Sequence, residues 1–469
     1  MFEFYPIILY LCFIFYRVNF KCTYIMIQRT ILHEIRDHLL QPEITLISGA
    51  RQVGKTTLMN MLMDDLVKAG KKVLFLSMDF EADAPFFQSQ VRLIDRIRLE
   101  FGDRPGFVFL DEIQRKENAG IFLKGLYDMK LPWKFVISGS GSIELKEKIY
   151  ESLSGRKRIF ELVPVSFHEF LDFRTEYKYT GRLSGFVRAN GPRSLELLNE
   201  YLNFGGYPRV VTAGTVRDKI LTINDIFQSY IDRDIRQMLT GGQPESFKRL
   251  IRLLASQTGQ MVNLSNLSND AQQSTPTLQK HLWLAQKTYF IRLVEPFYNN
   301  PTKEITKSPV VYYVDHGMRN FAINTFGNIQ SPHDYGFVFQ NLVANTLHSG
   351  LYGTPFSIHY WRTTEKAEVD FIIARKNDPI AVEVKFSAMK KPAISRSLRS
   401  FIGRYHPSSA WIVNLSLSAS QRTGPCEVRF MPFFDLPDVL GDLVQSIERV
   451  YLAEEKAFPY KIKGNRNPH

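Results

Sequence analysis

Short apolar runs rich in β-branched residues recur through the first third of the chain, separated by stretches with helical patterning. This alternation is typical of parallel strands joined by crossover helices. The ligand of such a sheet lies at the carboxyl ends of its strands. We therefore predict an α/β fold with a parallel sheet. The expected strands are residues 44–48, 72–77, 107–110, 134–138 and 159–162.

A glycine-rich stretch follows the first expected strand and precedes an expected helix at residues 58–69. Its spacing is that of a P-loop, and strand–loop–helix is the context that a P-loop requires. Its backbone N–H groups and the helix dipole favour an anion. We expect Lys55 to reach the β- and γ-phosphates and Thr56 to bind Mg²⁺; the alternative is an ordinary strand-to-helix turn. The predicted ATP-binding residues are Gly49, Ala50, Arg51, Gln52, Val53, Gly54, Lys55, Thr56 and Thr57.

Two acids end the third expected strand, in the form of a Walker B motif. We expect Asp111 to hold Mg²⁺ and Glu112 to polarise the attacking water. The alternative is a helix N-cap. The fourth strand ends in serines, and either Ser138 or Ser140 can sense the γ-phosphate unless this segment is a plain turn.

Arg156 follows a sharp turn before the fifth strand. An arginine there can neutralise transition-state charge on a phosphate bound by its own subunit or by the next one. A surface turn in a basic cluster is the alternative. The predicted catalytic residues are thus Glu112, Ser138 and Arg156.

The remaining chain changes character several times, which suggests further domains. Thr275, Gln279 and Lys280 begin the expected recognition helix of a winged helix, where they can meet DNA, although such modules also contact proteins. The expected divisions are an over-long start or short apolar leader at 1–25, the P-loop ATPase core at 26–175, a helical lid at 176–250, a winged-helix-like domain at 251–300, a C-terminal α/β domain at 301–455 and a basic tail at 456–469.

Acidic residues alternate along two expected strands of the last domain. Alternation puts Glu368 and Asp370 on one face, and it likewise pairs Glu383 with Lys385. Three acids and a lysine then meet, as in nucleases of the restriction type, which hold Mg²⁺ and activate water. We predict a second metal site at Asp370, Glu383 and Lys385; the alternative is an ordinary polar sheet face.

Composition adds two constraints. The 469-residue chain has a formal net charge of +12, which suggests an anionic partner beyond ATP, although a basic globular protein needs none. The only cysteines, Cys12, Cys22 and Cys426, lack the spacing of a metal site or a disulfide, so we expect a reducing, cytoplasmic location. The apolar run at residues 5–16 is shorter than the about 20 residues of a spanning helix; a short membrane anchor is the minority alternative.

The order of these motifs resembles a bacterial and archaeal family of predicted AAA-type ATPases, over roughly residues 26–440. The resemblance implies ATP binding and hydrolysis, a winged helix and a C-terminal domain of restriction-nuclease-like fold. It also implies that residues 311–318 match a motif of that family. Gln340 is a departure, because the family usually carries Glu there, and this weakens the expectation of metal binding.

Our main hypothesis is an ATPase whose nucleotide state controls a C-terminal effector domain. One alternative is a nucleotide-binding switch or adaptor with negligible turnover, and another is an ATP-controlled, metal-dependent DNA nuclease. DNA, a protein partner and further copies of the chain are all open as partners.

Overall fold

A five-stranded parallel sheet carries the amino-terminal third of the chain. The computed structural model describes residues 26–140, 152–236, 244–298, 308–329, 331–375 and 378–457. The strand order is β2-β3-β4-β1-β5, and every neighbouring pair is parallel. All five expected strands are present, as β1 (Ile44–Gly49), β2 (Val73–Ser77), β3 (Gly106–Asp111), β4 (Trp133–Ser140) and β5 (Lys157–Leu162).

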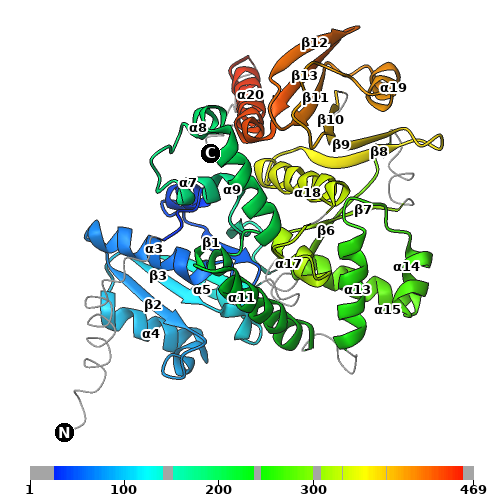
Figure 1. The fold of residues 1–469 in the computed structure, drawn as a ribbon. Helices are drawn as coiled ribbons and strands as arrows, with labels where there is room; N and C mark the ends of the chain where they lie inside the picture. The colour runs from blue at the N-terminus through cyan, green and yellow to red at the C-terminus, as the bar shows by residue number, and fades with distance from the viewer. Residues whose placement is uncertain are drawn as a thin grey trace, which may run out of the picture.

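Helices cover both faces of this sheet because its strands are apolar on both sides. On β1, Leu46 packs into one apolar cluster and the next residue, Ile47, into another. The Leu46 cluster includes α4 (Gln90–Phe101) and α5 (Ala119–Asp128), whereas the Ile47 cluster includes α2 (Ile31–His38) and α3 (Lys55–Lys68). The sheet is therefore the middle layer of three, as Figure 1 shows.

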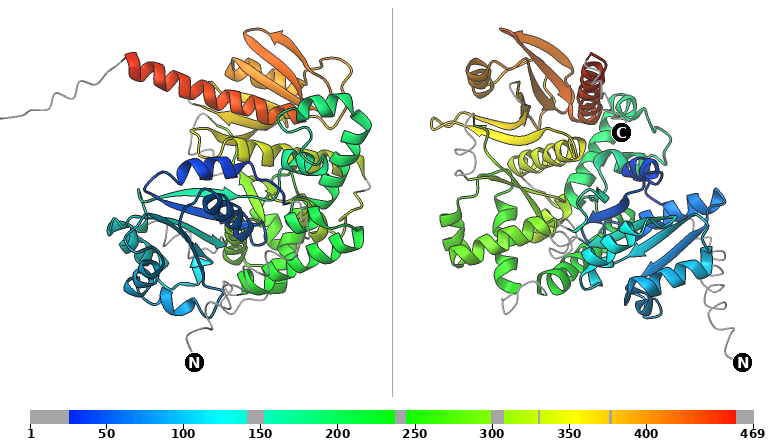
Figure 2. Two further views of the ribbon diagram at one scale, coloured as in Figure 1. Left: turned by 90° about the vertical axis from the view of Figure 1, so that its left-hand side faces the viewer. Right: turned by 180° about the vertical axis from the view of Figure 1, so that it is seen from behind.

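Helices form the middle of the molecule and separate its two large sheets (Figures 1 and 2). The Ile47 cluster continues without interruption into these helices, so the amino-terminal sheet and the helices share one core. A short hairpin follows them, in which β6 and β7 are antiparallel and Met261 bridges Val310. The elements are α7 (Phe167–Arg174), α8 (Leu183–Ala189), α9 (Gly191–Phe204), α10 (Pro208–Thr212), α11 (Val216–Ser229), the π-helix η3 (Tyr230–Ile235), α13 (Pro244–Ser256), α14 (Leu264–Ala271), α15 (Thr275–Lys287), β6 (Ile291–Val294) and β7 (Val310–Tyr313).

A second, mixed sheet forms the carboxyl-terminal region, with strand order β12-β13-β11-β10-β9-β8. One face packs against α18 and α20 and the other against α19. The elements are α17 (His316–Ala322), α18 (Pro332–Gly350), β8 (Ser357–Arg362), β9 (Glu368–Ala374), β10 (Ile380–Val384), α19 (Arg396–Tyr405), β11 (Ser409–Asn414), β12 (Ala419–Thr423), β13 (Cys426–Pro432) and α20 (Leu436–Ala457). No helix among the described residues is both long and apolar enough for a bilayer; the run at residues 5–16, the leader and most of the basic tail lie outside that part of the chain.

A buried carboxylate joins the helical middle to the start of α17. Asp315 accepts hydrogen bonds from the backbone N–H of Gly206 at 2.7 Å and of Met318 at 2.9 Å. Burial raises the pKa of Asp315 to about 6, although these hydrogen bonds act to lower it. The chain passes so closely that a Cβ on Gly205 would lie 2.4 Å from the Gly317 nitrogen. Only glycine fits there, and the φ of Gly205, +76°, adds to the requirement.

We predict that Gly205→Ala strongly lowers the thermal unfolding midpoint. The new methyl group must displace backbone atoms, and the alanine must adopt a left-handed φ. Gly181→Ala is the matched control, since Gly181 has φ +74° but no neighbour within 4 Å of a Cβ. The control carries the backbone strain alone, about 1–2 kcal/mol. Equal midpoints for the two variants would show that the close contact at Gly205 is unimportant.

Candidate functional site

The P-loop lies at the carboxyl end of β1, between β5 and the first turn of α3. Gln52 and Gly54 take positive φ angles of +61° and +97°, which turn the chain into the helix. At Gly49, the last residue of β1, an added Cβ would lie 2.2 Å from the carbonyl oxygen of Leu162. Glycine is needed at position 49 for close packing against β5.

The side chains of the loop divide into buried supports and outward groups. Ala50 and Val53 are buried, whereas Thr56 and Thr57 are exposed at the start of α3. Lys55 is also buried, and its Nζ donates to the carbonyl oxygens of Ala50 at 2.9 Å and Gly49 at 3.2 Å. The ammonium group therefore lies across the loop, within reach of an anion that the loop holds.

Thr56, Asp111 and Ser138 meet at the carboxyl ends of β1, β3 and β4. The Thr56 hydroxyl donates to Asp111 Oδ2 at 2.8 Å, and the Ser138 hydroxyl donates to Asp111 Oδ1. A hydroxyl and a carboxylate beside a phosphate site are the hard oxygen ligands that Mg²⁺ uses, with water and phosphate completing its shell. These residues fit the predicted magnesium site.

Glu112 follows Asp111 in a strained conformation, with φ +55°. Its backbone N–H donates to the Ser138 hydroxyl at 3.4 Å, and its carboxylate accepts a hydrogen bond from the Gln114 amide. Ser138 contacts both acids. Ser140 ends β4, but its side chain lies outside the described part of the chain, as do residues 141–151.

Arg156 lies at the amino ends of the strands, whereas the P-loop lies at their carboxyl ends. Its carbonyl accepts from the N–H of Ile44, the first residue of β1, whereas the P-loop follows the last residue of that strand. At about 3.3 Å per residue, the strand separates Arg156 from the loop by more than about 15 Å. Its guanidinium instead pairs with Asp128 at 2.7 Å. Arg156 therefore does not lie beside the P-loop of its own chain, because its turn precedes β5 whereas the loop follows the end of β1.

Two arginines that the motifs did not indicate contact the P-loop. Arg209, at the start of α10, donates to the Gln52 side chain at 3.1 Å, and Pro208 lies 3.9 Å from the Cβ position of Gly54. Arg29 donates to the carbonyl oxygen of Val53 at 3.1 Å. In the sequence, Arg209 directly follows the Gly-Gly-Tyr-Pro stretch at residues 205–208, which is the one feature that marks it. The residues around Arg29 give no indication that it contacts the loop.

The carboxyl-terminal acids are engaged by neighbouring side chains. Among the described residues, no group of three or more His, Cys, Asp or Glu side chains could hold a metal ion. Glu368 pairs with Arg362 at 3.1 Å. Glu383 pairs with Lys385 at 2.7 Å and accepts from Ser395, the N-cap of α19, at 2.9 Å.

Asp370 is held by other partners. Its carboxylate accepts from the Gln340 amide on α18 at 2.9 Å and from the Val384 N–H at 2.7 Å. A bulge explains the divergence from simple alternation, since Asp370 and Phe371 together lie opposite Tyr360 of β8. Glu383 is bound from the α19 side of the sheet and Asp370 from the α18 side, so each acid has its own hydrogen-bond partners.

Burial and charge perturb the ionisation of these groups. Burial raises the pKa of Asp370 to about 7, and the nearby Glu383 and Glu368 charges add to the rise, whereas the Val384 N–H and Lys385 oppose it. Burial acts to lower the pKa of Lys385, but the hydrogen bond and charge of Glu383 and the charge of Asp370 raise it overall. Gln340 thus donates to a carboxyl group that is partly protonated near neutral pH.

Three known families match successive parts of the chain. Residues 41–171 match a family described as an AAA domain. Residues 195–328 and 335–433 match two families described as domains of unknown function, DUF8612 and DUF4143. The AAA match covers the P-loop together with Asp111, Glu112 and Ser138, which supports an AAA-type ATPase domain there.

Whole-chain relatives are distant. An uncharacterized protein of Mycobacterium tuberculosis is 26% identical over 369 residues, 78% of this chain and 75% of that protein. One of Haemophilus influenzae is 27% identical over 358 residues, 73% of this chain and 82% of that protein. Among solved structures, AMPPCP-bound DnaA from Aquifex aeolicus aligns over 54% of this chain and 86% of its own, with 16% identity and a TM-score of 0.24. So low a score does not establish a shared overall arrangement.

We predict that Asp370→Asn becomes steadily more stable relative to the wild type as the pH rises from 4 to 8. The folded pKa of about 7 lies above the ordinary aspartate value of 3.8. The wild type therefore loses stability as rising pH forces Asp370 to ionise in the folded state, whereas the amide does not titrate. Urea unfolding across this pH range measures the difference. A constant difference would contradict the raised pKa.

Proposed function

We propose that the chain is an ATPase that binds ATP with Mg²⁺ at the P-loop and hydrolyses it there. The observation that carries this proposal is the convergence of Lys55, the Thr56–Asp111 pair and Glu112 at one end of the parallel sheet. The match of this segment to the AAA domain family supports it.

Each group has a role in such a reaction. Lys55 neutralises charge on the phosphates, and Thr56 and Asp111 hold Mg²⁺, which shields charge as the terminal phosphoryl group leaves. Glu112 orients the attacking water, and Ser138 fixes the relative positions of Asp111 and Glu112 through its two hydrogen bonds. The defined position of Glu112 favours turnover over the alternative of a nucleotide-binding switch with negligible hydrolysis.

We also propose that nucleotide state reaches the carboxyl-terminal region through α10. Arg209 contacts the loop, and three residues earlier Gly206 donates to Asp315. The next residue, His316, contacts Asn341 of α18 at 3.2 Å. A shift of α10 when ATP binds would therefore reach the buried contacts of Asp315 and His316, and through them α18, which carries Gln340.

A DNA-binding role rests on the three helices α13, α14 and α15 and the hairpin after them, an order typical of a winged helix. The Met261–Val310 bridge supplies the additional strand contact. Thr275, Gln279 and Lys280 are exposed at the start of α15, where a recognition helix meets base edges and phosphate. Metal-dependent cleavage is not part of this proposal, because Asp370 and Glu383 are each bound by other side chains.

We also propose that copies of the chain associate with one another. Arg156 is 31% exposed and could act on a nucleotide held by a second copy of the chain.

We predict that Lys55→Ala abolishes measurable ATP binding, because it removes the buried ammonium group that lies across the loop. Glu112→Gln should keep binding and lose turnover by at least about 100-fold. Lys68→Ala, an exposed lysine at the end of the same helix, is the control and should leave both unchanged. Isothermal titration calorimetry and phosphate release measure the two effects. Tight ATP binding by Lys55→Ala would contradict the phosphate site.

We further predict that Lys280→Ala weakens duplex DNA binding in fluorescence anisotropy. Loss of one phosphate contact should reduce the slope of log affinity against log salt by about one. Lys68→Ala again serves as the control for net charge. No DNA binding, or binding that Lys280→Ala leaves unchanged, would favour the alternative that α13 to α15 contact a protein.

A further inference from the structure

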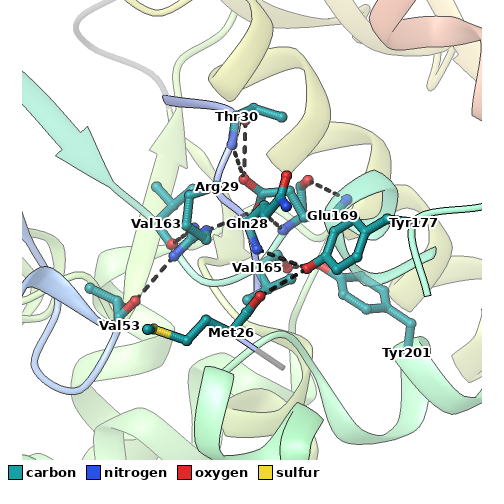
Figure 3. Close-up of polar contacts among 11 residues, drawn as sticks. Met26, Gln28, Arg29, Thr30, Val53, Val163, Val165, Glu169, Tyr177 and Tyr201 are labelled. Atoms are coloured by element: carbon teal, nitrogen blue, oxygen red, sulfur yellow. Dashed lines mark hydrogen bonds and ion pairs between the residues drawn. The ribbon is translucent and has the colours of Figure 1, made fainter. Parts of the chain in front are cut away.

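Arg29 is a buried cation on the segment before α2, behind the P-loop (Figure 3). Its side chain is 7% exposed and pairs with Glu169, which is 5% exposed, at 3.2 Å. Taking two charges out of water is costly unless their remaining hydrogen-bonding groups are satisfied. Arg29 and Glu169 both have several hydrogen-bond partners, which connect separate parts of the chain.

The guanidinium bridges three parts of the chain. Besides Glu169 on α7, its Nη1 donates to the carbonyl oxygen of Val53 at 3.1 Å and its Nη2 to that of Val163 at 2.5 Å. Val53 belongs to the P-loop, and Val163 follows β5. A planar fork with several donors can satisfy such a set, whereas the point charge of a lysine cannot.

Glu169 is held in turn by the backbone around it. Its carboxylate accepts from the N–H of Thr30 at 2.7 Å and of Ser166 at 2.8 Å. Burial acts to raise the pKa of Glu169, but the charge of Arg29 and these hydrogen bonds keep it below its ordinary value. The carboxylate is therefore ionised and orients the guanidinium toward the loop.

The bond to Val53 determines which way one peptide unit faces. In a planar trans peptide, the C=O and the following N–H point in opposite directions. Because Arg29 holds the Val53 carbonyl on the β5 and α7 side, the N–H of Gly54 must face away from Arg29. Gly54 immediately precedes Lys55 and the first turn of α3, where the P-loop offers N–H groups to phosphate.

We propose that Arg29 is a positioning residue for nucleotide binding: by holding the Val53 carbonyl, it directs the Gly54 N–H toward the phosphate that the loop receives. This inference rests on the proposed ATP site and deepens it. Since the same guanidinium binds Val163 and Glu169, the link from β5 to α7 is positioned together with the loop.

The test compares ATP and ADP affinities of the full chain by calorimetry. Arg29→Lys keeps the charge opposite Glu169 but cannot bridge all three partners. We expect it to weaken ATP and ADP by a similar factor, on the order of ten- to a hundredfold, as for loss of one hydrogen bond to a charged group. In Arg29→Ala, added methylguanidinium should restore part of the ADP affinity by reoccupying the site.

Tyr177→Phe is the matched control. The Tyr177 hydroxyl binds the same segment, through the Met26 carbonyl at 3.1 Å and the Gln28 N–H at 2.9 Å, but touches no P-loop atom (Figure 3). It should change the affinities by less than about twofold, the scale of a weak, partly solvated hydrogen bond. An equal loss in Tyr177→Phe and Arg29→Lys would show that anchoring the segment, and not orienting the loop, is what matters, and would overturn the inference.

The remaining outcomes separate this inference from the proposed function. If wild type binds ATP and Lys55→Ala does not, but Arg29→Lys binds as wild type does, the positioning role alone is wrong. If wild type binds no nucleotide, both fail. Should Arg29→Lys not fold, the double variant Arg29→Gln and Glu169→Gln removes both buried charges, and wild-type ADP affinity in that protein would equally contradict the proposal.

Discussion

A loop that turns its N–H groups toward an anion must find donors elsewhere for its own carbonyl groups. Buried backbone groups are almost always hydrogen-bonded. In this protein two cations meet that need: Lys55 binds the carbonyls of Gly49 and Ala50, and Arg29 binds that of Val53. The P-loop therefore depends on charged side chains from its own helix and from the segment before α2.

The same dependence ties the nucleotide site to the rest of the chain. The Ser48 hydroxyl, on the strand that leads into the loop, lies 3.1 Å from the Tyr289 hydroxyl just after α15. Arg209 of α10 contacts the loop through Gln52, and Asp315 accepts a hydrogen bond from Gly206, two residues before this helix. The apolar core also runs from β1 into the helices, so the first sheet and the helices are packed as one unit.

Local pattern was sufficient for much of the fold and for the centre of the site. Apolar runs located the five parallel strands, and motif spacing brought Lys55, Thr56, Asp111 and Ser138 together, because each lies at the carboxyl end of a strand or at the start of its helix. Three features could not be predicted from local sequence pattern. Arg29 meets Val53 and Glu169 only through tertiary packing, the bulge opposite Tyr360 changes which way Asp370 faces, and the placement of Arg156 depends on which end of β5 its turn adjoins. None of these has a signal in spacing or alternation.

Hydrogen–deuterium exchange of Glu112→Gln with and without ATP and Mg²⁺ tests the central claim most directly, because this variant should hold ATP without consuming it. We expect slower exchange in residues 50–57, and a change that extends to residues 206–212 and 315–318, where Gly206 donates to Asp315. Unchanged exchange in residues 50–57 would contradict the nucleotide site itself. Protection confined to residues 50–57 would contradict the connection from that site to the carboxyl-terminal region.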